Sequence, residues 1–278
     1  MTAGDRITDL RVSPGEVAPM QAAAAVVAAC RNALAANGGD ILGEVAAGEE
    51  TFADWRHYPA GEVYDPKSHA QYFYHAHPAA DRIAREHGHF HTFLRAEGMP
   101  PGAAPLVLPE TAVADAARPP PQAAPLKQGA RDEVSHLVAI ALDRHGEPIR
   151  LFTTNRWVTG ETWYRAEDVI CMLDRFTLGE VGRCAILNRW ISAMLALFRP
   201  QIVALLTRRD ETVMAWRRRR RTNVFEDIRL EITSSVEIDL GAQFAFLDRA
   251  GTGTGADPSA RLSRLPPMAE GWGEGYAR

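Results

Sequence analysis

The sequence YFYHAHP at residues 72–78 and EHGHFHTFLR at residues 86–95 indicates the fold class, because both segments alternate histidines with aromatic or small residues. Successive side chains of a β-strand point to opposite faces. Two such strands side by side would turn their histidines to one face and their other side chains to a core. The histidines expected to share this face are His75, His77, His87, His89 and His91.

Five of the chain's nine histidines lie between positions 75 and 91, and this concentration predicts a metal site. Neutral imidazole is the commonest nitrogen ligand for zinc, iron, copper and nickel. Three imidazoles with one open position form a catalytic zinc site, and three imidazoles, or two with a carboxylate, suit non-haem iron. We expect one or two transition-metal ions, zinc or iron, with Glu86 as general base or carboxylate ligand. The alternatives are solvated or hydrogen-bonded structural histidines, and a helix over residues 81–87.

The segments that follow predict the rest of the sheet. Residues 136–142 are almost continuously apolar, residues 143–146 suit a turn, and residues 148–154 resume as a strand, which together indicate a β-hairpin. Residues 229–240 alternate apolar and polar side chains, which predicts another strand. His136 heads the hairpin and is a further candidate metal ligand; the alternative is a strand-end histidine bonded to a backbone carbonyl.

Helical periodicity and capping patterns complete the prediction of a single α+β domain, in which several helices pack an antiparallel sheet carrying the histidine-rich strand pair. The predicted helices cover residues 13–37, 166–176, 181–198 and 200–217. The predicted organisation is an N-terminal helix at 1–45, an α+β metal-binding domain at 46–248 with an irregular Pro- and Ala-rich connection at 98–130, and a flexible tail at 249–278.

A second polar group follows the hairpin, at Asn155, Arg156 and Trp157. An arginine can hold a carboxylate or phosphate through two parallel hydrogen bonds. Arg156 is therefore a candidate catalytic and substrate-binding residue for a small anionic substrate, with Asn155 and Trp157 beside it. The alternative is a structural arginine that pairs with a nearby acid under tryptophan packing.

Composition favours a cytoplasmic protein with no nucleic-acid or membrane partner. The net charge of -4 gives no general attraction to anionic polymers or membranes. Arg217 to Arg221 form a basic run, but they follow a predicted helix whose dipole they complement, and acidic residues come soon after. Three widely spaced cysteines suggest no disulfide framework, and the apolar run at residues 20–30 is too short to span a membrane.

The histidine segments, with HLVAI at residues 136–140 and LFTTNRWV at residues 151–158, resemble an uncharacterised bacterial family over most of residues 50–240. This resemblance implies no activity. The histidines themselves predict a metal-dependent enzyme acting on a small substrate. Zinc would make it a hydrolase or hydratase, and iron an oxygen-using enzyme. The alternative is a non-catalytic metal carrier, sensor or accessory protein; the oligomeric state stays open.

Overall fold

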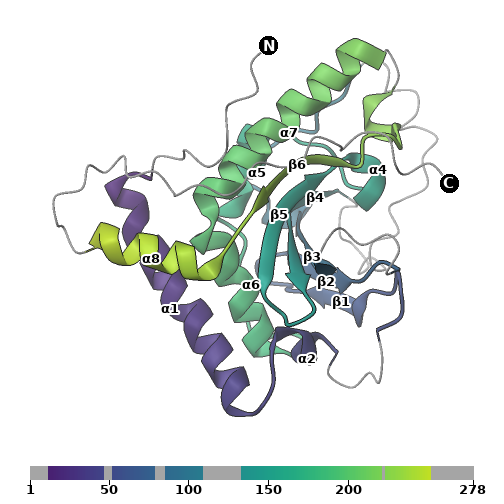
Figure 1. Ribbon diagram of the computed structural model, residues 1–278. Coiled ribbons are helices and arrows are strands. Elements are labelled where there is room, and N and C mark those ends of the chain that lie inside the picture. The colour runs from purple at the N-terminus through teal and green to yellow at the C-terminus, as the bar shows by residue number, and fades with distance from the viewer. Residues whose placement is uncertain (1–11, 47–51, 79–84, 109–132, 221–222, 252–278) are drawn as a thin grey trace.

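A six-stranded antiparallel sheet with strand order β1–β2–β3–β4–β5–β6 forms the centre of the protein (Figure 1). The computed structural model describes residues 12–46, 52–78, 85–108, 133–220 and 223–251. The strands are β1 (Tyr58–Tyr64), β2 (Ala70–His75), β3 (Glu86–Arg95), β4 (Val134–Asp143), β5 (Pro148–Thr154) and β6 (Ile232–Glu237). The predicted 136–154 hairpin is β4 and β5, whereas β1 was not predicted.

Helices cover one face of this sheet, so the predicted α+β class is confirmed (Figure 1). The main core joins helical side chains to strand residues such as Phe90, Ile140 and Leu151. The helices are α1 (Pro14–Ala36), α2 (Ile41–Val45), α4 (Arg156–Thr159), α5 (Ala166–Leu173), α6 (Ala185–Leu197), α7 (Arg199–Arg220) and α8 (Leu240–Gly251), with short 3-10 turns η3 (Ala96–Gly98) and η4 (Val224–Glu226).

Helix α1 begins at a capping box formed by Ser13 and Glu16. The Ser13 backbone N–H donates to the Glu16 carboxylate at 2.8 Å, and the Glu16 backbone N–H donates to the Ser13 carbonyl at 3.0 Å. Among the described helices it is long and apolar enough to cross a membrane, and α6 with α7 would pass the same test only as a span bent by 71°. Val27 and Cys30 are nevertheless buried, and α1 packs against α6 and α8. This packing is typical of a core helix.

The end of the chain departs from its predicted structure. The strand predicted at 229–240 is limited to β6, because Asp239 starts a helix by accepting a hydrogen bond from the Ala242 backbone N–H at 2.7 Å. The resulting α8 extends to Gly251, so the first residues of the predicted 249–278 tail are helical. Residues 252–278, and most of the predicted irregular connection at 98–130, lie outside the described residues.

Two β-bulges decide which side chains reach the face of the sheet away from the core. Glu86 pairs with Asp143 and Gly88 with Leu142, which leaves His87 as an extra residue in β3. Likewise, Leu137 is the extra residue of β4, since Thr92 pairs with Val138 and Phe93 with His136. A bulge shifts the alternation of side chains by one residue. Both extra residues therefore turn toward the core, where Leu137 is fully buried.

Candidate metal centre

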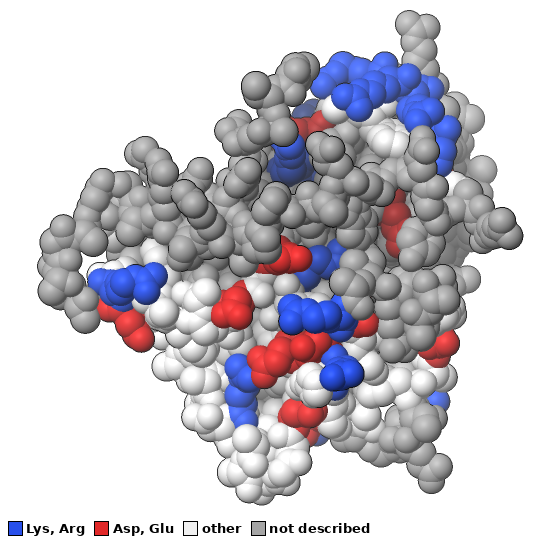
Figure 2. Space-filling view, viewed as in Figure 1, with Lys and Arg blue, Asp and Glu red and all other residues white. Residues whose placement is uncertain are grey.

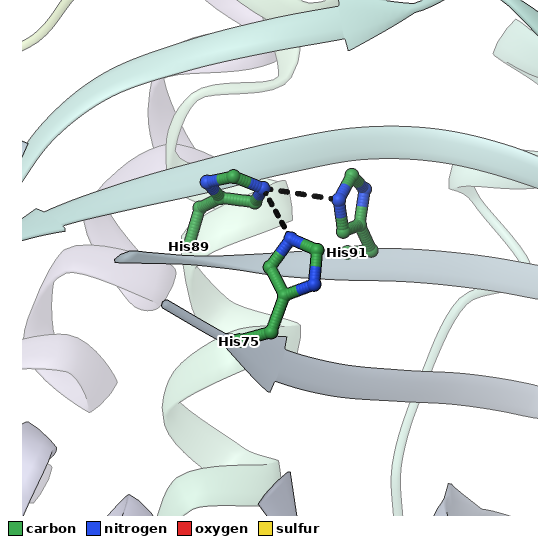
Figure 3. Close-up of side chains that lie close together, drawn as sticks. All are labelled: His75, His89 and His91. Atoms are coloured by element: carbon green, nitrogen blue, oxygen red, sulfur yellow. Dashed lines mark hydrogen bonds between the residues drawn. The ribbon is translucent and has the colours of Figure 1, made fainter. Parts of the chain in front are cut away.

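His75, His89 and His91 converge on the sheet face away from the main core (Figure 3). His75 is the last residue of β2 and pairs in register with His89 in β3, while His91 follows two residues later on the same face. The Nε2 atom of His89 lies 2.8 Å from Nε2 of His75 and 3.1 Å from Nε2 of His91. The predicted sharing of a face by these three histidines is therefore observed.

Two of the three separations between these Nε2 atoms are close to those between ligands of one small ion, and all three atoms lie within 4.8 Å of one another. In a tetrahedral zinc site with zinc–nitrogen bonds of about 2.05 Å, the ligand nitrogens lie about 3.3 Å apart. The separations of 2.8 and 3.1 Å are slightly shorter than this value. A small movement of the side chains would therefore fit them to an ion.

Glu86 sets the tautomer of His89. Its Oε1 lies 2.6 Å from His89 Nδ1, and its Oε2 accepts a hydrogen bond from Arg150. Burial alone would raise the pKa of Glu86, but the hydrogen bonds and charges of His89 and Arg150 hold this pKa below its ordinary value. The ionised carboxylate can only accept, so His89 donates from Nδ1 and its Nε2 lone pair faces the other histidines.

His136 is the hydrogen-bond partner of the outer nitrogen of His91, as Glu86 is for His89. Its Nε2 lies 3.0 Å from His91 Nδ1, and its backbone N–H donates to Glu161 at 2.8 Å. When His91 donates from Nδ1 to His136, the Nε2 lone pair of His91 also points into the cluster. His136 was a predicted ligand; the structure places it as a partner of His91, outside the group of three.

Burial favours the neutral, metal-binding form of His75, His91 and His136. Burial, together with neighbouring imidazoles, lowers the pKa of His75 and His91 well below the usual value. For His136, burial and then the charge of Arg209 lower the pKa to about 3. Neutral side chains avoid the mutual repulsion that three imidazolium ions would have at these distances.

The other two histidines of the predicted face occupy different positions. His77 lies just beyond the end of β2, half-buried, with its Nε2 3.3 Å from Nε2 of His75, at the edge of the group. His87 is turned by the β3 bulge toward the core side, where its Nδ1 lies 2.8 Å from the Tyr74 hydroxyl. The expectation that His87 shares the face of His89 is therefore wrong, because strict alternation ignores the bulge.

Asn155, Arg156 and Trp157 bind the polypeptide itself. Arg156 donates from Nε and Nη2 to Oε1 of Glu226 at 3.0 and 2.7 Å, and its guanidinium lies over the Phe225 ring. Asn155 caps α4 and donates to the Val224 carbonyl, while Trp157 donates to the Leu230 carbonyl at 2.9 Å. These contacts are those of the structural alternative.

The site also contains residues that were not selected from the sequence. Arg150 pairs with Glu86 and lies over the Phe152 ring at 4.4 Å. The sequence contains a pattern that could have identified Arg150. Arg150 and Phe152 alternate in β5 opposite Ala141 and Ala139, whose small side chains leave room on that face. Trp55 follows no pattern in the sequence, and the structure alone brings its ring to 4.3 Å from that of His77.

The predicted basic run forms the exposed C-terminal end of α7, where Figure 2 shows blue side chains gathered at one end of the molecule. Arg218, Arg219 and Arg220 are exposed, and Arg220 lies over the Trp216 ring at 5.3 Å. Arg221 lies outside the described residues. The run occupies the position where cations complement the helix dipole, as the prediction held.

Comparison with known proteins supports the resemblance noted in the histidine segments. The match is to the family described as "Domain of unknown function (DUF6969)" and covers residues 21–238. Neither the curated proteins nor the solved structures gave a match. Because the family match extends from α1 through β6 and includes every histidine of the candidate centre, the chain belongs to the DUF6969 family.

Proposed function

We propose that this protein binds a transition-metal ion through the Nε2 atoms of His75, His89 and His91. The observation that carries the proposal is the convergence of these three nitrogens within ligand distance of one another. Glu86 and His136 support it, because each provides a hydrogen-bond partner for the Nδ1 of a proposed ligand. Such outer partners fix the orientation of ligating histidines in metal sites.

The ligand set favours zinc over an iron site of the two-histidine-one-carboxylate type. The cluster contains three imidazoles, and both oxygens of Glu86 are engaged by His89 and Arg150 rather than turned toward the three nitrogens. Iron sites of the two-histidine-one-carboxylate type need a free carboxylate. Three imidazoles leave a fourth tetrahedral position for water or substrate, as in catalytic zinc sites.

We therefore propose a zinc-dependent hydrolase or hydratase that acts on a small anionic substrate. A zinc ion would supply its chemistry by lowering the pKa of a bound water and polarising the substrate. The protein would hold the ligands and exclude bulk water, since His89 and His91 are buried. Glu86 would orient His89 instead of acting as the general base expected from the sequence, because Arg150 and His89 already occupy it.

A non-catalytic carrier or sensor is the second candidate, and His77 favours it. Its Nε2 lies 3.3 Å from that of His75, so a small movement would bring a fourth imidazole to the ion and close the site. An open site would bind added anions at the metal, whereas a closed site would not. The free cysteines suit a cytoplasmic location in both cases.

Elemental analysis of untagged protein tests the proposal. Wild type refolded or dialysed with zinc should retain the ion stoichiometrically, and His75→Ala should lose most of it. His69→Ala is the matched control, since His69 bonds the Tyr64 hydroxyl outside the cluster. Wild type without retained metal, or a loss that is equal in both variants, would refute the proposal.

A further inference from the structure

The exposed fraction of the side chains increases from His91 to Trp55 across the candidate centre. This increase indicates the side from which a ligand reaches the centre. His91 is 1% exposed and His89 is 5% exposed, whereas His75 and His77 are half-buried. Trp55, whose ring contacts that of His77, is 56% exposed. In the described part of the chain, a ligand therefore approaches the three nitrogens past the Trp55 indole.

Trp55 has an unfavourable backbone conformation, and a backbone hydrogen bond holds it in this position. Its φ of 64° lies in the left-handed region, which bulky side chains rarely adopt. A hydrogen bond from its backbone N–H to the Ala76 carbonyl at 2.9 Å ties it to the segment just after β2. Neither this conformation nor an exposed indole favours folding by itself, and such residues concentrate at functional sites.

The indole lies beside His77, whose Nε2 is 3.3 Å from Nε2 of His75 at the edge of the proposed site. Its ring is 4.3 Å from the His77 ring at an interplanar angle of 35°, and its centroid is 6.3 Å from that of His75. A ligand atom bound to the metal next to His75 would therefore place the atoms that follow it against the indole. Aromatic rings favour flat partners, through offset or edge contacts.

The positive charge of a bound metal ion determines which chemical group of the ligand binds the metal. An imidazole that ligates a metal is neutral and so does not offset the charge of the ion, and Glu86, the carboxylate in contact with His89, is ion-paired with Arg150. A divalent ion here keeps its positive charge in a largely buried setting. It will therefore attract an anionic group and repel the cations that tryptophan faces otherwise bind.

We propose that Trp55 is the platform on which the planar part of the ligand stacks, and that the site selects small planar carboxylates over non-planar ones. The carboxylate takes the fourth position on the metal and the conjugated or aromatic part lies on the indole. This inference rests on the proposed metal site and adds the substrate class and the residue that selects it.

Cobalt-loaded protein gives a direct test, because bound cobalt has a visible spectrum that changes when an anion coordinates. Benzoate and cyclohexanecarboxylate carry the same charge and similar size, but only benzoate is flat. Wild type should bind benzoate about three- to tenfold more tightly, which is the range for one aromatic contact. In Trp55→Ala the ratio should fall to about one, and Trp55→Phe should keep most of it.

Two further variants separate stacking from bulk and from general effects. Trp55→Leu keeps an apolar side chain without a ring and should lose the preference as Trp55→Ala does, so a folding defect in one does not end the test. Trp216→Ala removes another partly exposed indole, at the end of α7, and should leave the preference unchanged.

The outcomes distinguish the two proposals. Wild type that binds cobalt but shows no preference for benzoate, or Trp55→Leu that keeps the preference, overturns the role of Trp55 and leaves the metal site standing. Wild type that binds no cobalt overturns the metal site and this inference with it. Loss of the preference in both Trp55→Leu and Trp55→Ala, with cobalt still bound, supports the platform.

Discussion

Among the described residues, the polar cluster around Arg156 and the histidine centre differ in the kind of hydrogen bonds they make. Around Arg156, charged and polar groups bond to Glu226, Val224 and Leu230 of a neighbouring segment. At the histidine centre, by contrast, the outer nitrogens of His89 and His91 have protein partners, while their inner nitrogens point at each other 3.1 Å apart.

This contrast separates a cluster whose polar groups are paired within the chain from the cluster proposed to bind a metal. A buried polar group needs a partner, and one without it destabilises the fold by about 1–3 kcal/mol. The Arg156 cluster meets that need within the chain. At the histidine centre, if both inner nitrogens carry lone pairs, their repulsion is unrelieved within the chain, and the proposed cation between them would relieve it.

Metal removal should give the largest difference between the two clusters. At free zinc about a thousand times the dissociation constant, binding stabilises the folded state by about 4 kcal/mol. A chelator should therefore lower the Tm of wild type, and of Glu226→Ala, by several degrees while leaving His75→Ala unchanged. Thermal unfolding monitored by circular dichroism measures this effect. A shift of the same size in His75→Ala would place the metal elsewhere.

The sequence was sufficient to predict the histidine-bearing strand pair and the face shared by three of its histidines, because period-two alternation is a property of any strand. His75, His89 and His91 followed from that rule alone. The bulges at His87 and Leu137 could not be predicted, since they depend on pairing between β3 and β4, which are distant in sequence. The roles of His136, Glu86 and Arg150 depend on the same pairing.

Acid should destabilise the metal-free protein through the same histidines. The folded-state pKa of His91 and His136 is lowered, whereas an unfolded histidine has a pKa of about 6.5. Below that pH the unfolded chain binds more protons, so stability falls as pH falls, for His136 down to about pH 3. Above about pH 7 both states are neutral and the dependence ends.

The slope gives the size of this effect. Each histidine contributes about 1.4 kcal/mol per pH unit below its unfolded pKa, so His75, His91 and His136 together contribute about 4 kcal/mol per unit. Denaturant unfolding of the metal-free protein between pH 7 and 5 measures it. His136→Gln should remove about a third of the slope. An unchanged slope in that variant would show that His136 is not buried as a neutral group.

Gly88→Ala tests whether the β3 bulge positions the histidines. A Cβ at Gly88 would collide with the His75 carbonyl and lie 2.6 Å from the Tyr74 hydroxyl, so β2 and β3 must move apart. We expect a loss of about 2 kcal/mol in stability together with weaker zinc binding. Gly15→Ala is the control, because nothing lies near its Cβ position at the start of α1. Full zinc affinity in Gly88→Ala would contradict this role.

The smallest expected effect belongs to the Arg156 cluster. Glu226→Ala removes the partner of a guanidinium whose side chain is only 5% exposed, but Glu226 itself is 39% exposed, so water partly replaces it. We expect a loss of about 1–2 kcal/mol in unfolding free energy, with unchanged zinc content. Glu226→Gln keeps the acceptor oxygen and should lose less. If Glu226→Ala instead lowered zinc content without lowering stability, Arg156 would belong to the functional site and the distinction between the two clusters would fail.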